Sequence, residues 1–144
     1  QSLDHLLITA MRKKATEKNV DWRVVLQADS ASHDSKDWRN LQTLVGYAME
    51  LVEEQLGKSD KTILLSYPGL LARYNRIDLL ERLREKVAIT GGDLYGLWLL
   101  LATDEQSKLP MLDGKAIPVT SSAQWARIPD TWINSSYKNN EKYI

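Results

Sequence analysis

The sequence predicts an α/β fold, a small three-layer domain with a short, mainly parallel sheet. Apolar segments with helical spacing alternate with short apolar runs, in the order helix, strand, helix, strand, helix, strand. Each pair of successive strands is joined by a helical segment, which is the crossover connection that parallel strands require. The 144 residues fit one domain. We expect this domain to occupy residues 1–134, with an irregular C-terminal part, and residues 135–144 to form a polar tail.

The first half of the chain predicts two helices around one strand. Ser2 can cap a helix in which Leu3, Leu7 and Met11 recur at helical spacing. Residues 22–28 predict the first strand, because the segment is short, contains β-branched residues and is bounded by polar ones. A polar loop over 29–35 leads to the second helix, which keeps its apolar period until Gly57, a suitable C-cap.

The second half predicts two further strands around a third helix. Residues 62–66 form a near-continuous apolar run that Tyr67-Pro68-Gly69 ends. The third helix carries Ile77, Leu80, Leu83 and Val87 at helical spacing and stops before Gly91. Residues 96–102 are apolar throughout, which predicts a third strand that is buried on both faces.

Beyond Ala102 the pattern becomes irregular. Residues 109–115 predict a loop and a tight turn, since Asp-Gly at 113–114 is a common turn dipeptide. Residues 117–119 predict a short edge strand, where the proline is tolerated. A short helix is expected to begin at Ser121-Ser122, and a turn is expected over 129–133.

Composition and charge exclude several classes of function. Lys plus Arg number 19 and Asp plus Glu number 19, so the net charge is zero and no global attraction to nucleic acid or an anionic membrane is expected. The chain has no cysteine, which excludes disulfides, thiolate metal sites and thiol nucleophiles. Its two histidines exclude a three-histidine metal site. The chain does not open with a basic segment followed by an apolar one, as a signal peptide would, so we expect a cytoplasmic protein. We also expect no resident metal or cofactor.

A catalytic interpretation rests on the predicted strand ends. In a parallel sheet, ligands bind beyond the carboxyl ends of the strands. Asp29 and His33 follow the first predicted strand, and Asp104 and Glu105 follow the third. Carboxylates meeting there predict a magnesium site for a metal-assisted hydrolase or nuclease. The simpler interpretation, which we favour, is that these polar residues cap helices and shape loops.

The aromatic residues predict a contact surface. The chain has five Trp, six Tyr and no Phe. Trp22 and Trp98 fall inside predicted strands, where packing explains them. Other aromatic residues lie beside Pro and Arg, and Trp, Tyr and Arg dominate the binding energy of protein interfaces. The predicted partner-binding residues are Tyr67, Pro68, Gly69, Arg73, Trp125, Arg127 and Trp132.

Five blocks of residues resemble one family. They cover 63–74, 78–84, 96–100, 109–119 and 126–132. Together they look like the C-terminal region of bacterial phage-resistance proteins of the Pgl/BREX type, in particular the serine/threonine-kinase component. The resemblance spans residues 62–133 and includes no kinase catalytic signature, so it assigns no catalytic residue to this chain.

The resemblance implies a role within a larger cytoplasmic protein. It suggests a non-catalytic C-terminal module, with the enzymatic domains upstream, in a defence protein. The expected partners are other domains of the same chain or other proteins of the defence system, and no membrane. The sequence thus leaves an interaction module and the metal-assisted enzyme as its two main function hypotheses. A nucleic-acid-binding module is a further alternative, which the zero net charge argues against.

Overall fold

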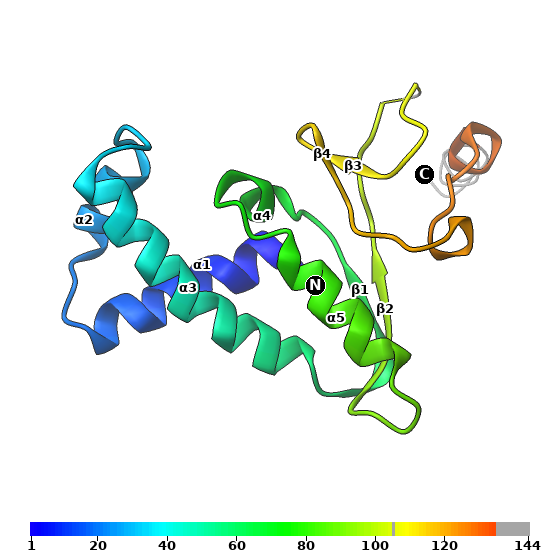
Figure 1. Ribbon diagram of the computed structural model, residues 1–144, viewed down its shortest axis with the longest axis horizontal. Helices are drawn as coiled ribbons and strands as arrows, with labels where there is room; N and C mark the ends of the chain where they lie inside the picture. The colour runs from blue at the N-terminus through cyan, green and yellow to red at the C-terminus, as the bar shows by residue number, and fades with distance from the viewer. Residues whose placement is uncertain (105, 135–144) are drawn as a thin grey trace, which may run out of the picture.

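A computed structural model describes residues 1–104 and 106–134 (Figure 1). Glu105 and the predicted tail over 135–144 lie outside the described residues. The elements are α1 (Leu3–Glu17), α2 (Trp22–Asp29), α3 (Lys36–Leu56), β1 (Ser59–Leu65), α4 (Gly69–Arg73), α5 (Asp78–Ala88), β2 (Leu94–Leu99), β3 (Met111–Leu112), β4 (Lys115–Ala116) and the 3₁₀ helix η1 (Ser122–Gln124).

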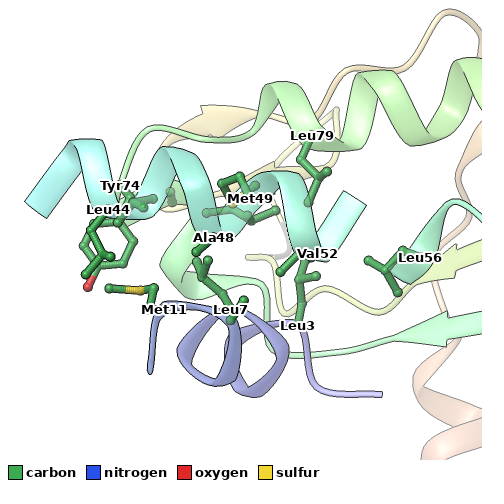
Figure 2. Close-up of a cluster of buried hydrophobic side chains, with 14 of the residues drawn as sticks. Leu3, Leu7, Met11, Leu44, Ala48, Met49, Val52, Leu56, Tyr74 and Leu79 are labelled. Atoms are coloured by element: carbon green, nitrogen blue, oxygen red, sulfur yellow. The ribbon is translucent and has the colours of Figure 1, made fainter. Parts of the chain in front are cut away.

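Helices α1 and α3 pack against each other along the N-terminal half of the molecule (Figure 1). The Ser2 hydroxyl accepts a hydrogen bond from the backbone N–H of His5, which starts α1 where the sequence predicted. Leu3 and Leu7 of α1 then point toward Val52 of α3 (Figure 2). All three side chains are buried, so the apolar stripes that predicted these two helices form the core.

The predicted first strand is wrong, because residues 22–28 belong to helix α2. Asp21 caps this helix by accepting a hydrogen bond from the backbone N–H of Arg23. Val25 and Ala28 are the buried residues of α2, and their spacing of three places both on one helical face. Burial of that face beside α3 outweighs the modest strand preference of the two adjacent valines.

The short parallel sheet is confirmed. Strand β1 pairs with β2 in parallel, with Ile63 opposite Leu97 and Leu65 opposite Leu99. Helices α4 and α5 form the crossover between them, where the sequence predicted a single helix. Both strands begin two or three residues before the predicted ranges of 62–66 and 96–102. Ser66, which directly follows β1, pairs with the N-terminal segment on the side away from β2. The backbone N–H of Ser66 donates to the Gln1 carbonyl (2.9 Å) and that of Leu3 to the Ser66 carbonyl (2.8 Å).

The two faces of the sheet are covered unequally. Ile63, Leu97 and Leu99 pack against the buried core, beside α5. On the opposite face Leu64 is 57% exposed, Trp98 64% and Leu100 49%. The α/β class is confirmed and helices flank the sheet, but burial of residues 96–102 on both faces is wrong. The described helices pack on one face of this strand pair, so alternate side chains of β2 remain in solvent.

The C-terminal part is irregular, as predicted. Strands β3 and β4 pair antiparallel around Asp113 (φ 47°) and Gly114 (φ 77°), so the predicted tight turn is confirmed. This turn sets the register, and the paired strand lies at 115–116 rather than at the predicted 117–119. Helix η1 provides the short helix expected after Ser121, whereas residues 130–134 are helical where a turn was predicted.

No helix within residues 1–104 and 106–134 has the length and the hydropathy needed to cross a membrane.

Helix α3 depends on its N-cap. The Ser35 hydroxyl accepts a hydrogen bond from the backbone N–H of Trp38, itself a buried residue. We expect Ser35→Ala to lower the free energy of unfolding by about 1 kcal/mol, because one donor of the first turn loses its partner. Urea unfolding followed by circular dichroism measures this. Ser121→Ala is the matched control, since Ser121 precedes η1 without a side-chain cap bond, and an equal loss there would contradict the assignment.

Candidate functional site

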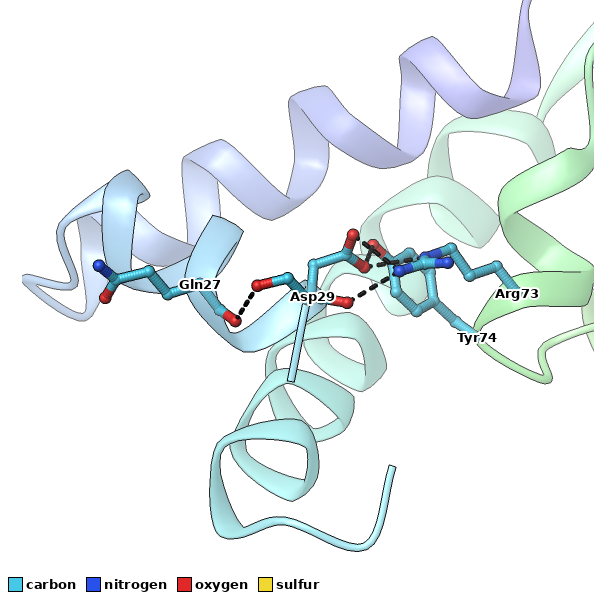
Figure 3. Close-up of polar contacts among 5 residues, drawn as sticks. Gln27, Asp29, Arg73 and Tyr74 are labelled. Carbon is cyan, nitrogen blue, oxygen red and sulfur yellow. Dashed lines mark hydrogen bonds and ion pairs between the residues drawn. The ribbon is translucent and has the colours of Figure 1, made fainter. Parts of the chain in front are cut away.

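Asp29 joins the end of α2 to the end of α4 (Figure 3). Its carboxylate accepts hydrogen bonds from Nε of Arg73 (2.9 Å), Nη2 of Arg73 (2.9 Å) and the hydroxyl of Tyr74 (2.9 Å). Nη2 of Arg73 also donates to the backbone carbonyl of Asp29 (2.8 Å). Since Arg73 and Tyr74 lie at the end of α4, these bonds attach α2 to the segment that follows β1.

Aromatic rings extend this contact to α3. His33 stacks on Trp38, with ring centroids 3.9 Å apart, and Trp38 lies 6.1 Å from Tyr74. The guanidinium of Arg73 is 5.9 Å from the Trp38 ring centroid. We call Asp29, His33, Trp38, Arg73 and Tyr74 the Asp29 cluster. It joins α2, the following loop, α3 and α4.

The ionisation of the Asp29 cluster favours a structural contact. Burial by itself would raise the pKa of Asp29, but the hydrogen bonds from Arg73 and Tyr74 outweigh it and hold that pKa below its ordinary value. Burial, helped by the hydrogen bond to Asp29, raises the pKa of Tyr74 to about 12. At neutral pH the cluster therefore contains a carboxylate–guanidinium pair and a neutral phenol, and neither the Asp29 carboxylate nor the Tyr74 phenol is close to changing its protonation state.

Asp104 shapes the loop after β2. Its carboxylate accepts hydrogen bonds from Oγ of Ser107 (3.0 Å) and from the backbone N–H groups of Ser107 (2.8 Å) and Gln106 (3.0 Å). The Ser107 hydroxyl and these backbone donors lower the pKa of Asp104. Arg127 donates to the backbone carbonyls of Asp104 (3.3 Å) and Ser107, and so ties this loop to the C-terminal segment.

The carboxylates of the metal-site hypothesis are not brought together. Asp29 ends a helix, so it does not lie at a strand end of the sheet as the hypothesis required. Figure 1 shows α2 and the segment between β2 and β3 at opposite ends of the molecule. Across residues 1–104 and 106–134, no three Asp, Glu or His side chains are placed to hold a metal ion. Glu105 lies outside the described residues.

The predicted partner-binding residues divide into three places. At the junction of β1 and α4, Tyr67 is 72% exposed, while Pro68 is buried and Gly69 half-buried. Arg73 is bound to Asp29 in the Asp29 cluster. On the C-terminal segment Trp125 is half-buried, Arg127 spans two loop carbonyls, and Trp132 is 66% exposed. Tyr67 and Trp132 are therefore the predicted aromatic residues that present most surface to solvent.

The open sheet face was not predicted from the sequence. The term "open sheet face" refers below to the exposed side chains of Leu64, Trp98 and Leu100. Trp98 was assigned to packing because residues 96–102 contain no polar residue to mark a solvent face. The composition of β1 could have indicated this face. Asp60, Lys61 and Thr62 are charged or polar, and a strand that contains them is not expected to be buried on both faces.

A cleft of about 580 Å³ lies where the ends of α3 and α5 meet. Glu53 borders it and bonds to Nε of Arg82 (2.7 Å) and Nζ of Lys86 (3.1 Å). Burial opposes ionisation of Glu53, but these cations outweigh it and lower its pKa. Two of the charged residues that border the cleft, Glu53 and Lys86, are thus engaged in joining α3 to α5.

The chain is similar to "Probable kinase PglW" of Streptomyces coelicolor. The two are 28% identical over 152 aligned residues, which cover 99% of this chain and 10% of that protein. The chain therefore spans about a tenth of the length of the curated relative that it matches. The resemblance to a Pgl protein is confirmed, and it extends from residues 62–133 to nearly the whole chain. No family model matches the chain. No solved structure matches it either.

Proposed function

We propose that this chain is an interaction module of a multidomain bacterial phage-defence protein, with no catalytic role of its own, and that it acts in the cytoplasm. The similarity to a Pgl protein over nearly the whole chain supports the defence assignment. That relative is named a probable kinase and is about ten times longer than the aligned segment. We infer that a kinase domain of such a protein lies in the remainder of the polypeptide.

One observation carries the proposal: several large aromatic side chains of this small domain are exposed to solvent. Tyr67, Trp98 and Trp132 are all more than 60% exposed. Exposed aromatic groups contribute little to folding, whereas at an interface they supply most of the binding energy. The polar candidates Asp29 and Asp104, in contrast, form hydrogen bonds within the chain that stabilise the fold, so they are not available to a partner in the same way.

The partner we favour is another domain of the same polypeptide. The experiment purifies two proteins separately, this chain and the longer protein from which this segment has been deleted. Biolayer interferometry then measures whether the two bind each other. Saturable binding supports the proposal. If no binding occurs to the remaining polypeptide, but another purified protein of the same defence system binds, then the module acts between chains. Binding to neither contradicts the interaction role, and a gene encoding this stretch alone contradicts the multidomain role.

Substitution of exposed aromatic residues should weaken that binding. We expect Tyr67→Ala and Trp132→Ala each to raise the dissociation constant about tenfold or more, because buried aromatic anchors dominate interfaces. The same interferometry measures it. Val24→Ala on α2 is the control, since Val24 is apolar and 54% exposed but lies away from both positions. Unchanged affinity in both aromatic variants would exclude this surface.

A further inference from the structure

Strand β2 forms an open edge of the sheet. Strand β1 occupies one side of β2, and the sheet contains no strand on the other side within the described residues (Figure 1). On the corresponding side of β1, Gln1 and Leu3 pair with Ser66, which directly follows the strand. The backbone hydrogen bonds of the described residues include none that joins another segment to the outer edge of β2.

The register shows which backbone groups lie on that edge. The N–H of Leu100 donates to the carbonyl of Leu65 (2.8 Å), so Leu100 directs its backbone groups toward β1. In a parallel pair, alternate residues of a strand bond to the same neighbour. Tyr95, Leu97 and Leu99 therefore direct their N–H and C=O groups outward, away from β1.

This edge lacks two of the features that keep strands from pairing, charged side chains and proline. Folded proteins protect open edges with charged side chains, prolines, bulges or covering segments. Residues 94–102 contain neither a charged residue nor a proline. Beside this edge lies the open sheet face of Leu64, Trp98 and Leu100, so apolar side chains and free backbone groups coincide. Such an edge is a template for another strand.

The sequence of β2 is suited to pairing with itself. We propose that a second copy of this chain adds its own β2 antiparallel to this edge, centred on Leu97. In that register Leu97 faces Leu97 of the second copy and exchanges two hydrogen bonds with it, while Tyr95 faces Leu99. No charged residue falls opposite another within the strands.

Gly96 and Trp98 make this register specific. They flank Leu97 and point to the open sheet face, so each Trp98 lies directly opposite Gly96 of the second copy. Gly96 has no side chain, and a Cβ there would lie 3.0 Å from Oγ1 of Thr62. The Thr62 side chain covers Gly96 from the β1 side, so the indole of the second copy would reach Gly96 from the open edge, in an aromatic–glycine cross-strand pair of the kind that stabilises strand edges. Because the pairing is symmetric, the contact occurs twice.

The dimer would unite the two open sheet faces. Two copies of Leu64, Trp98 and Leu100 would then form one continuous apolar surface across the joined sheets. This inference goes beyond the proposed function, because it rests on the β2 edge and concerns the chain alone. It shares only the exposed Trp98 with the proposed function, whose own test uses Tyr67 and Trp132. Its failure would leave the binding to other domains untouched.

The test measures the mass of the isolated chain by sedimentation equilibrium from about 1 µM to about 1 mM, the range in which edge pairing of limited area is expected. We expect a reversible shift from one chain to two. Hydrogen exchange at the two ends of this range reports the register. The amides of Tyr95, Leu97 and Leu99 should gain protection in the dimer, whereas those of Gly96, Trp98 and Leu100 are protected by β1 throughout.

Two variants locate the contact. Trp98→Lys should raise the dissociation constant of the dimer about tenfold or more, since it removes both aromatic–glycine contacts and places a charge on the edge. Leu97→Pro should abolish the dimer, because it removes the outward N–H at the centre of the pairing. Circular dichroism verifies the fold, and Trp98→Lys keeps the test valid if Leu97→Pro does not fold. Leu26→Lys, 55% exposed on α2, is the matched control.

Two results would overturn the proposal. One is a chain that stays monomeric over the whole concentration range. The other is a dimer that persists at unchanged strength in Trp98→Lys, or in folded Leu97→Pro, or that Leu26→Lys disrupts equally.

Discussion

Leu79→Ala should lower the free energy of unfolding by about 3 kcal/mol. Leu79 is fully buried, with 0% of its surface exposed. It extends from α5 toward Met49 and Val52 of α3 (Figure 2). Replacing leucine by alanine there removes apolar surface that is hidden from water and leaves a cavity that the two helices cannot fully close.

Urea unfolding at neutral pH measures this loss as a lower midpoint at an unchanged slope. Leu26→Ala is the matched control, because Leu26 is 55% exposed on α2 and should cost less than about 1 kcal/mol. A similar loss for both leucines would show that the α3–α5 contact is not a central part of the core. Because α5 links β1 to β2, a strong Leu79 effect would also show that the sheet depends on this helical contact.

Asp29→Ala should cost about 2 kcal/mol of stability, mainly because it leaves the hydroxyl of Tyr74 without its acceptor. Tyr74 is 4% exposed, so water replaces that acceptor poorly. The ion pair contributes less than its geometry suggests, because the Arg73 side chain is 44% exposed and solvent screens it. Thermal unfolding measures the loss. Asp60→Ala, at an exposed carboxylate of β1, is the control and should change little.

The Asp29 effect should also depend on pH in one direction. The folded-state pKa of Asp29 lies below its ordinary value of 3.8, so the folded protein favours the ionised form. The stabilisation is therefore fully present above the unfolded-state pKa and disappears as the pH falls through the folded-state pKa. We expect the stability difference between the wild type and Asp29→Asn to be constant from about pH 6 to 8 and to shrink below pH 3.8. A difference that grew in acid would contradict this account.

The stability predictions for Leu79 and Asp29 and the binding predictions for Tyr67 and Trp132 concern different residues, so together they separate folding from recognition. The Asp29 cluster and the α3–α5 contact use polar and apolar residues that hold the helices together. Tyr67, Trp132 and the open sheet face use residues whose removal should leave stability nearly unchanged. A variant set that divides in this way would show that the exposed aromatic residues serve binding.

The candidate site was predictable in part. Tyr67 and Trp132 were expected to contact a partner because they lie outside the predicted strands, near Pro and Arg, and the structure shows that both are exposed. Arg73 and Arg127 were assigned to the same surface, but each bonds to a partner that is distant in the sequence, and Pro68 is buried. The Asp29–Arg73 bond joins residues 44 positions apart, and only the folded chain brings them within hydrogen-bond distance.

The sequence by itself determined the α/β class, the helices with clear apolar periods, the parallel pairing implied by a helical crossover and the turn at Asp113-Gly114. These features depend on neighbours along the chain, whose spacing is visible in the residue order. Tertiary structure alone decided that residues 22–28 are helical, because burial of Val25 and Ala28 beside α3 outweighs local strand preference. It also decided that Trp98 faces solvent, since an apolar strand shows nothing of which face its helices cover.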